Sequence, residues 1–178
     1  MPERIIDCCT LLNLNTGWAG LSELAEFDAS WFISKSVFNE SEYIREYDPG
    51  RNIVTIPLDL DGPLKTGLLS IITAESEREL LDYVDFAIEL DDGEAESLAL
   101  AKNRHLILVT DDQKSLHVAQ RSVVNVQTIT TVSVLREWEK KSRANSKRLK
   151  EVIDRIRHLA RFHPPSNSPD RAWWDSMT

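Results

Sequence analysis

Acidic residues recur at three places where an apolar run ends or a helix is expected to begin. Asp7 directly follows a short apolar run, and Asp111 and Asp112 follow a longer one. Glu94 opens a segment rich in Ala and Leu. In a parallel sheet the carboxyl ends of strands and the starts of the following helices meet at one edge. These separated carboxylates can therefore share one crevice.

Clustered carboxylates repel one another unless a cation compensates their charge. Their hard oxygen atoms suit Mg²⁺ or Mn²⁺. Divalent ions held in this way can activate water, neutralise phosphate oxygens and stabilise the leaving alkoxide in phosphodiester hydrolysis. The sequence thus indicates a nucleolytic metal site. The alternative, that each acid only caps a helix or lies in a loop, applies to every one of these residues taken alone.

The elements that would position these acids alternate between strand and helix. Residues 4–6 and 105–109 are the clearest strands, and the segment 94–103 should be helical, with acids in its first turn where the helix dipole favours them. Such alternation predicts a parallel sheet covered by helices on both faces. The other expected elements are a helix after Asp7, a strand at 31–33, a helix from Ser34 or Ser36 to about Tyr47, an irregular connection at 51–67, a strand within 68–72, a helix capped by Thr73 or Ser76, a helix at 113–120, a strand near 123–126 and a helix capped by Thr130 or Thr131 through Trp138.

Three motifs in this order resemble the PIN-domain family, most closely its prokaryotic branch of VapC-like toxin ribonucleases. They are IIDCCTLLNL at 5–14, DDGEAESLALA at 91–101 and LILVTDD at 106–112. The resemblance covers about the first 140 residues, and the GEAE motif followed by a strand ending in TDD is its most specific part. It implies a three-layer α/β/α sandwich around a central parallel sheet, and an acidic quartet that uses Mg²⁺ or Mn²⁺ to cleave RNA.

Carried over position by position, the resemblance implies Asp7, Glu94 and Asp112 as metal ligands, with Asp111 as an adjacent assisting acid. The family's second acid follows a V-x-x-E pattern, which here ends at Glu40. Glu42 stands two residues away, about 200° around a helix, so at most one of the two can face the cluster.

Two departures from the family pattern concern the surroundings of these acids. Cys9 stands where a small hydroxyl or amide residue normally orients the first aspartate, and a thiol is a poor donor. Thr10 is a possible substitute. Arginines are common just after the TDD motif in this branch, but Lys114 is the only cation near it here. The contacts to substrate phosphates are therefore open.

Charge is distributed unevenly along the chain. The formal net charge is −8, yet ten basic and four acidic residues lie between Arg136 and Arg161, so the remainder carries −14. An acidic body with a basic helical extension suggests an intramolecular clamp or a docking arm for an anionic partner. A solvated helix face with salt bridges is an equally good interpretation.

Two regions beside the motifs carry weaker expectations. Cys8 and Cys9 are neighbours that cannot easily form a disulfide or a zinc site, so we interpret them as reduced core residues. We divide the chain into a PIN-like domain at 1–140 and a basic, Pro-, Ser- and Trp-containing extension at 141–178. From His163 onward we expect no structure of its own. The pair Trp173 and Trp174 either docks on this protein, a second copy or a partner, or lies in a disordered end.

Taken together, the sequence favours a metal-dependent endoribonuclease, expected to be the toxin of a type II toxin–antitoxin pair. Its expected partners are RNA, an antitoxin protein and a second copy of the chain. There is no glycine-rich phosphate loop, and no segment approaches a membrane span or resembles a signal peptide, so we expect a cytoplasmic protein. A non-catalytic PIN-like interaction module and an RNA-processing nuclease outside toxin biology remain alternatives.

Overall fold

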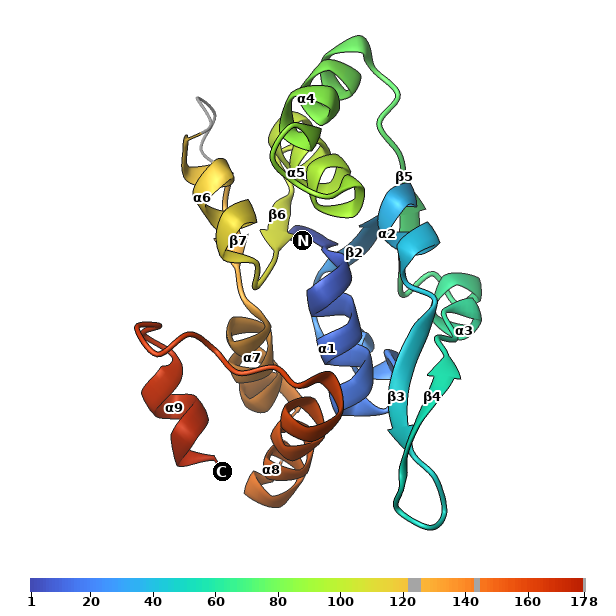
Figure 1. Ribbon diagram of the computed structural model, residues 1–178, viewed down its shortest axis with the longest axis vertical. Helices are drawn as coiled ribbons and strands as arrows, with labels where there is room; N and C mark the ends of the chain where they lie inside the picture. The colour runs from blue at the N-terminus through green and yellow to red at the C-terminus, as the bar shows by residue number, and fades with distance from the viewer. Residues whose placement is uncertain (122–125, 143–144, 178) are drawn as a thin grey trace.

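A five-stranded parallel sheet forms the centre of the protein. The computed structural model describes residues 1–121, 126–142 and 145–177 (Figure 1). The strands run in the order β5-β2-β1-β6-β7, and every pairing is parallel. The predicted α/β class with a parallel sheet is therefore confirmed. The strands are β1 (Glu3–Ile6), β2 (Ser30–Ser34), β5 (Ser70–Ile72), β6 (Ile107–Val109) and β7 (Thr128–Ile129).

Helices cover both faces of this sheet, which makes three layers. Neighbouring residues of one strand point to opposite faces, and accordingly Ile5 and Leu108 lie in one hydrophobic core while Ile6 and Val109 lie in another. The first core includes side chains of α5 (Asp92–Arg104) and α6 (Gln113–Arg121), with residues of α4 (Glu77–Ala87) packed against it. The second core includes α1 (Cys8–Trp18), the short helix η1 (Ser22–Glu26) and α7 (Thr131–Ser142).

A β-hairpin stands apart from the central sheet, and here the sequence-based expectation is wrong. Helix α2 (Lys35–Glu40) ends well before Tyr47, and the chain enters strand β3 (Tyr43–Tyr47). Residues 51–67 are not irregular, because they contain β4 (Ile53–Pro57) and α3 (Asp61–Lys65). β3 and β4 pair in antiparallel register around the turn at Asp48 to Arg51. The β-branched residues of β4 favour a strand. The nearby prolines and glycines led instead to the prediction of an irregular connection.

Several predicted boundaries shift by a few residues. Ser76 rather than Thr73 caps α4, in a capping box with Glu79. β6 begins at Ile107, because His105 ends α5 in a left-handed conformation with φ 57°. The last strand is β7, whereas the strand expected near 123–126 falls largely on residues 122–125, which lie outside the described residues.

The C-terminal segment packs onto the body. Helix α8 (Ser146–Arg155) continues into one π-helical turn, η2 (Ile156–Ala160), and both lie along α1 (Figure 1). A Cβ atom at Gly17 of α1 would come within 2.8 Å of the Ile156 side chain, so only glycine allows this close approach. Buried residues of α8 and η2 belong to the same core as α1. The division at residue 140 stays a prediction.

The tail after His163 contains more structure than expected, because α9 (Arg171–Ser176) is helical. Trp174 is fully buried and packs edge-on against Phe162 at 5.6 Å between ring centroids. Arg136 lies over the Trp173 ring and pairs with Asp170. Of the interpretations left open for the tryptophan pair, docking on the protein itself therefore describes Trp174.

Ion pairs tie the basic segment to the acidic body. Arg148 pairs with Glu23, and Arg155 pairs with Glu46 at 2.6 Å. These contacts correspond to the clamp interpretation of the charge distribution. Within the described ranges, no helix is both long and apolar enough to cross a membrane.

Candidate active site

Asp7 occupies the carboxyl end of the central strand β1. It caps α1 by accepting a hydrogen bond from the Thr10 backbone N–H at 2.7 Å. Its second oxygen accepts the Thr110 hydroxyl at 2.5 Å, from the end of the neighbouring strand β6. Only 1% of Asp7 is exposed. Burial raises its pKa to about 7, although the hydrogen bonds from Thr110 and Thr10 oppose this shift. The carboxylate thus lies where removal from water is costly.

Glu94 lies in the first turn of α5 and is half-buried. Burial raises the pKa of Glu94, and the negative charges of Asp112 and Asp91 raise it further. Lys114 opposes them only in part, as the weakest of these influences. The acids of the crevice therefore repel one another more than the nearby cation attracts them.

Asp111 and Asp112 have different surroundings although they are adjacent. Asp111 accepts hydrogen bonds from the backbone N–H and the hydroxyl of Thr131, and from Asn13 at 3.1 Å. It therefore joins the start of α7 to α1, and burial raises its pKa. Asp112 accepts the Ser115 backbone N–H at 2.7 Å and so caps the start of α6. Of the two, Asp112 is the one whose charge acts on Glu94.

The second acid of the quartet has two candidates, Glu40 and Glu42. Glu40 accepts the backbone N–H of Gly93 at 2.9 Å, directly beside Glu94. A Cβ atom at Gly93 would stand 2.5 Å from the other Glu40 oxygen, so a larger residue here would displace the Glu40 carboxylate from this contact. Among the described residues, Glu42 makes only backbone hydrogen bonds. The geometry therefore brings Glu40, and not Glu42, to the start of α5.

Cys8 and Cys9 border the crevice and are both free thiols. The expectation that both lie in the core is wrong, because Cys8 is half-buried and Cys9 is exposed. Their position beside the carboxylates explains this, since they open α1 immediately after Asp7. Partial removal from water beside α1 raises the pKa of Cys9 even though its side chain is exposed, and the charges of Asp7, Glu94 and Asp112 add to the shift. A thiol held neutral in this way is no nucleophile.

Two side chains with structural roles near the site, Thr110 and Glu96, were missed in the sequence analysis. The hydroxyl that orients Asp7 comes from Thr110, and its position directly after the last apolar residue of β6 is the signal that could have identified it. Thr10 contributes its backbone N–H. The second acid of the GEAE motif, Glu96, turns away and accepts hydrogen bonds from Ser36, Ala74 and Thr73. Glu96 therefore fastens α5 to the neighbouring connections.

The donor set of the crevice suits a divalent cation. Asp7, Glu94 and Asp112 offer hard oxygen atoms. The burial of Asp7 and the repulsion between Glu94 and Asp112 are what an added cation would offset. In the part of the chain that the structure describes, no three His, Cys, Asp or Glu side chains are already arranged around a common metal position. To hold one common ion, the carboxylates would have to reorient.

Comparison with protein families agrees with this geometry. The family model described as a PIN domain matches residues 3–168, and the chain belongs to the PIN-domain family. The match extends beyond the roughly 140 residues that carry the motifs. The PIN domain is a nuclease fold whose members generally use divalent metal ions and bind RNA. A comparison with curated protein sequences gives no match.

Proposed function

We propose that this protein is a metal-dependent endoribonuclease that uses Mg²⁺ or Mn²⁺. The observation that carries the proposal is the crevice at the carboxyl ends of β1 and β6. There the Thr110 hydroxyl donates to Asp7 and accepts the backbone N–H of Asp112, and the charge of Asp112 acts in turn on Glu94. Perturbed carboxylates gathered at a sheet edge are typical of a catalytic centre.

Each acid has a distinct role in this proposal. Asp7, Glu94 and Asp112 would hold the metal, which when bound supplies an activated water and stabilises the leaving alkoxide. Thr110 fixes the Asp7 carboxylate through a short hydrogen bond. Glu40 lies against the start of α5 and completes the negative rim beside Glu94. Asp111 joins α7 to α1 through its hydrogen bonds, and so stabilises the elements beside the crevice.

The biological setting follows from the resemblance to VapC-like toxins alone. In this setting the protein is the toxin of a type II toxin–antitoxin pair, acts in the cytoplasm, forms a homodimer and is neutralised by an antitoxin protein. An RNA-processing nuclease would have the same crevice. Growth arrest on expression, absent with Asp7→Asn, would distinguish the toxin from the processing enzyme.

The activity is tested with purified protein and a mixture of structured and single-stranded RNAs, in Mg²⁺, Mn²⁺ or EDTA. We expect cleavage that EDTA abolishes and that both Asp7→Asn and Glu94→Gln remove. Glu42→Gln is the matched control and should cleave like the wild type. If no protein cleaves and calorimetry detects no metal binding, the chain is a PIN-like interaction module without catalytic activity.

A further inference from the structure

An open cavity of about 490 Å³ lies beside the acidic crevice. Its walls come from α1, from the β3–β4 hairpin and from the segment around the end of η2. Cys9 and Asn13 line it on the α1 side. Cys9 lies two residues after Asp7 in the first turn of α1, and Asn13 donates a hydrogen bond to Asp111. The cavity therefore opens next to the carboxylates.

Two arginines line this cavity without carboxylate partners. Arg45 comes from β3 and Arg161 follows η2, and neither forms an ion pair within residues 1–121, 126–142 and 145–177. By contrast, Arg148 and Arg155 of the basic region pair with Glu23 and Glu46 of the body, and Arg136 pairs with Asp170 of the tail. In a chain of net charge −8, two uncompensated guanidinium groups facing one hollow form a local site for an anion.

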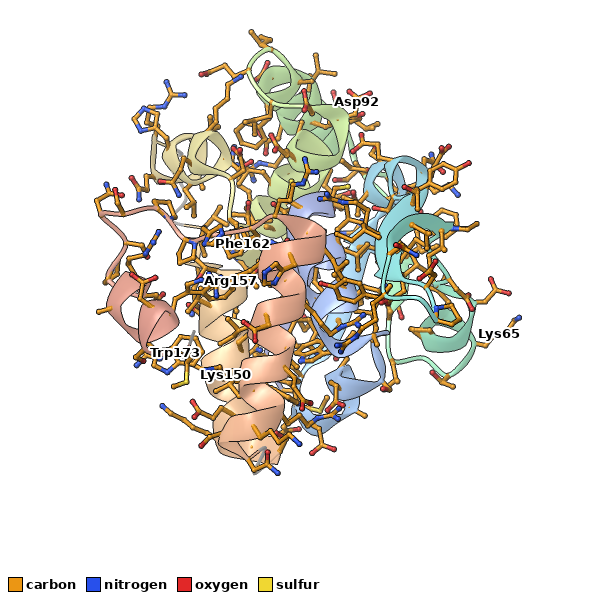
Figure 2. All side chains as sticks on the ribbon, turned by 60° about the horizontal axis from the view of Figure 1, so that its bottom comes forward. Lys65, Asp92, Lys150, Arg157, Phe162 and Trp173 are labelled. Atoms are coloured by element: carbon orange, nitrogen blue, oxygen red, sulfur yellow. The ribbon has the colours of Figure 1, made fainter. Side chains whose placement is uncertain are left out.

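The backbone of Arg161 adopts an unfavourable conformation. Its φ of 56° is in the left-handed region, where a residue other than glycine is unfavourable. This conformation ends η2 and is fixed by the next residue, because Phe162 packs against the buried ring of Trp174. Figure 2 shows Phe162 beyond the end of the helix that carries Lys150 and Arg157. The C-terminal segment thus holds one wall of the cavity in place.

Aromatic rings lie beside the two arginines. Tyr43 lines the cavity and is 58% exposed, so its ring is open to a ligand. Phe162 lines the same cavity, and also a second hollow that contains Asp111. Arginines that contact phosphates, interleaved with aromatic rings on which bases stack, are the typical means of binding single-stranded nucleic acid.

We propose that this cavity is a groove for single-stranded RNA leading to the acidic crevice, with Arg45 and Arg161 contacting phosphates and Tyr43 and Phe162 stacking on bases. The inference rests on the proposed nuclease function and answers how an acidic protein without arginines after its TDD motif holds RNA. An acidic peptide would use the arginines but gain little from the aromatic rings, so RNA is the better occupant.

The test measures binding separately from cleavage. A fluorescein-labelled single-stranded RNA of 15 nucleotides is titrated in EDTA and followed by anisotropy. We expect Arg45→Ala and Arg161→Ala each to weaken binding about 3- to 10-fold and to reduce the slope of log K against log salt by about 0.7. Tyr43→Ala should weaken binding at least about 5-fold, whereas Tyr43→Phe keeps it, because stacking needs the ring and not the hydroxyl.

Two controls change charge away from the cavity. Arg51→Ala lies at the hairpin turn and Lys150→Ala on the exposed side of α8, and both should bind RNA within 2-fold of the wild type. Since Arg161 has a positive φ, Arg161→Gly is the companion variant that keeps the same backbone conformation if Arg161→Ala unfolds. Circular dichroism melting verifies that each variant is folded.

The outcomes separate this proposal from the proposed function. If the wild type cleaves, the cavity variants should raise KM and keep kcat within about 2-fold. Cleavage with unchanged KM and unchanged binding in these variants would overturn the groove and leave the nuclease intact. Binding that depends on the cavity but without cleavage by any protein would support the groove and remove the nuclease. Equal binding of duplex RNA, or displacement of the RNA by polyglutamate at the same charge concentration, would overturn single-strand recognition.

Discussion

Two groups of buried or half-buried acids in this protein have opposite electrostatic surroundings. At the interface of α4 and α5, Arg104 lowers the pKa of Glu79 to about 2, and Lys102 and Asn103 both bind Asp82. At the crevice, burial and neighbouring acids raise the pKa of Asp7 and of Glu94. Carboxylic acids in the same protein thus have opposite pKa shifts, because the fold places different neighbours beside them.

Compensating partners therefore distinguish structural acids from candidate functional acids in this fold. Burial alone does not decide, because Glu96 is 3% exposed and its pKa is nonetheless lowered, with burial opposed by hydrogen bonds from Ser36, Ala74 and Thr73. The acids at α4 and α5 are satisfied by the protein. The acids at the crevice lack such partners, so their ionised form is costly to the protein, and a bound cation would lower that cost.

The largest expected effect is the loss of cleavage on neutralising a crevice acid. Asp7→Asn should lower kcat/KM by at least about 100-fold, because a metal ion contributes several kcal/mol to the transition state. Asp82→Asn, the same change at the α4–α5 interface, should leave cleavage per folded molecule within about 2-fold. Steady-state kinetics on both variants compares them, and equal losses would contradict the distinction between the two groups.

The converse effect concerns stability. Glu79→Ala should lower the free energy of unfolding by about 2–3 kcal/mol, because it leaves Arg104 unpaired and removes the capping box of α4. Urea denaturation measures this value. Glu77→Ala, an exposed acid in the same helical turn, should change stability by less than about 0.5 kcal/mol. A similar small change for Glu79→Ala would show that this acid is not structural.

A third effect is the pH dependence of stability without metal. The folded-state pKa of Asp7, about 7, lies above its ordinary value of 3.8. The folded protein therefore keeps a proton that the unfolded chain has already released, and stability falls as the pH rises through this interval. Between pH 5 and 7 the loss should be about 2 kcal/mol.

Asp7→Asn does not titrate, so it should lack this component. In EDTA, the stability of Asp7→Asn relative to the wild type should therefore increase by about 2 kcal/mol from pH 5 to pH 7. Denaturation at several pH values measures the difference and cancels the titration of all other groups. A constant difference would mean that the Asp7 carboxylate is already compensated in the fold.

The smallest effect sharpens the assignment of the second acid. Glu40→Gln should lower kcat/KM about 10-fold, because it removes a charge beside Glu94 while keeping an oxygen that can accept the Gly93 N–H. Glu42→Gln should have less than a 2-fold effect. Metal titration by calorimetry gives an independent measure, and a reversed order of the two variants would assign Glu42 to the crevice.

The sequence predicted the sheet because its strands carry distinct signals. The apolar runs at β1 and β6 end at acids, and the helical segments between the strands have helical spacing of apolar residues. The hairpin was missed because β3, with the sequence YIREY, shows no alternation of buried and exposed positions and no apolar face. Its register with β4 depends on the turn at 48–51.

Where the candidate site residues lie was predictable to a similar extent, although their roles stay a proposal. Strand ends and a helix start are local properties of the sequence, and they placed Asp7, Glu94 and Asp112 at one edge of the sheet. The role of Glu40 over Glu42 depended on Gly93, 53 residues further along, and that of Thr110 on the pairing of β1 with β6. Contacts of this kind depend on tertiary packing, so no local pattern contains them.

The docking of α8 and η2 on α1 also has a consequence for the folding pathway. Arg155 donates to the carbonyl oxygen of Thr16 across 139 positions of sequence, so this contact closes a loop that contains β2, β5, β6 and β7 of the central sheet. Contacts between such distant residues carry a large loop-closure entropy and slow folding. We therefore expect the sheet with its nearest helices to form early and the C-terminal helix to dock last, with a protease-sensitive intermediate in between.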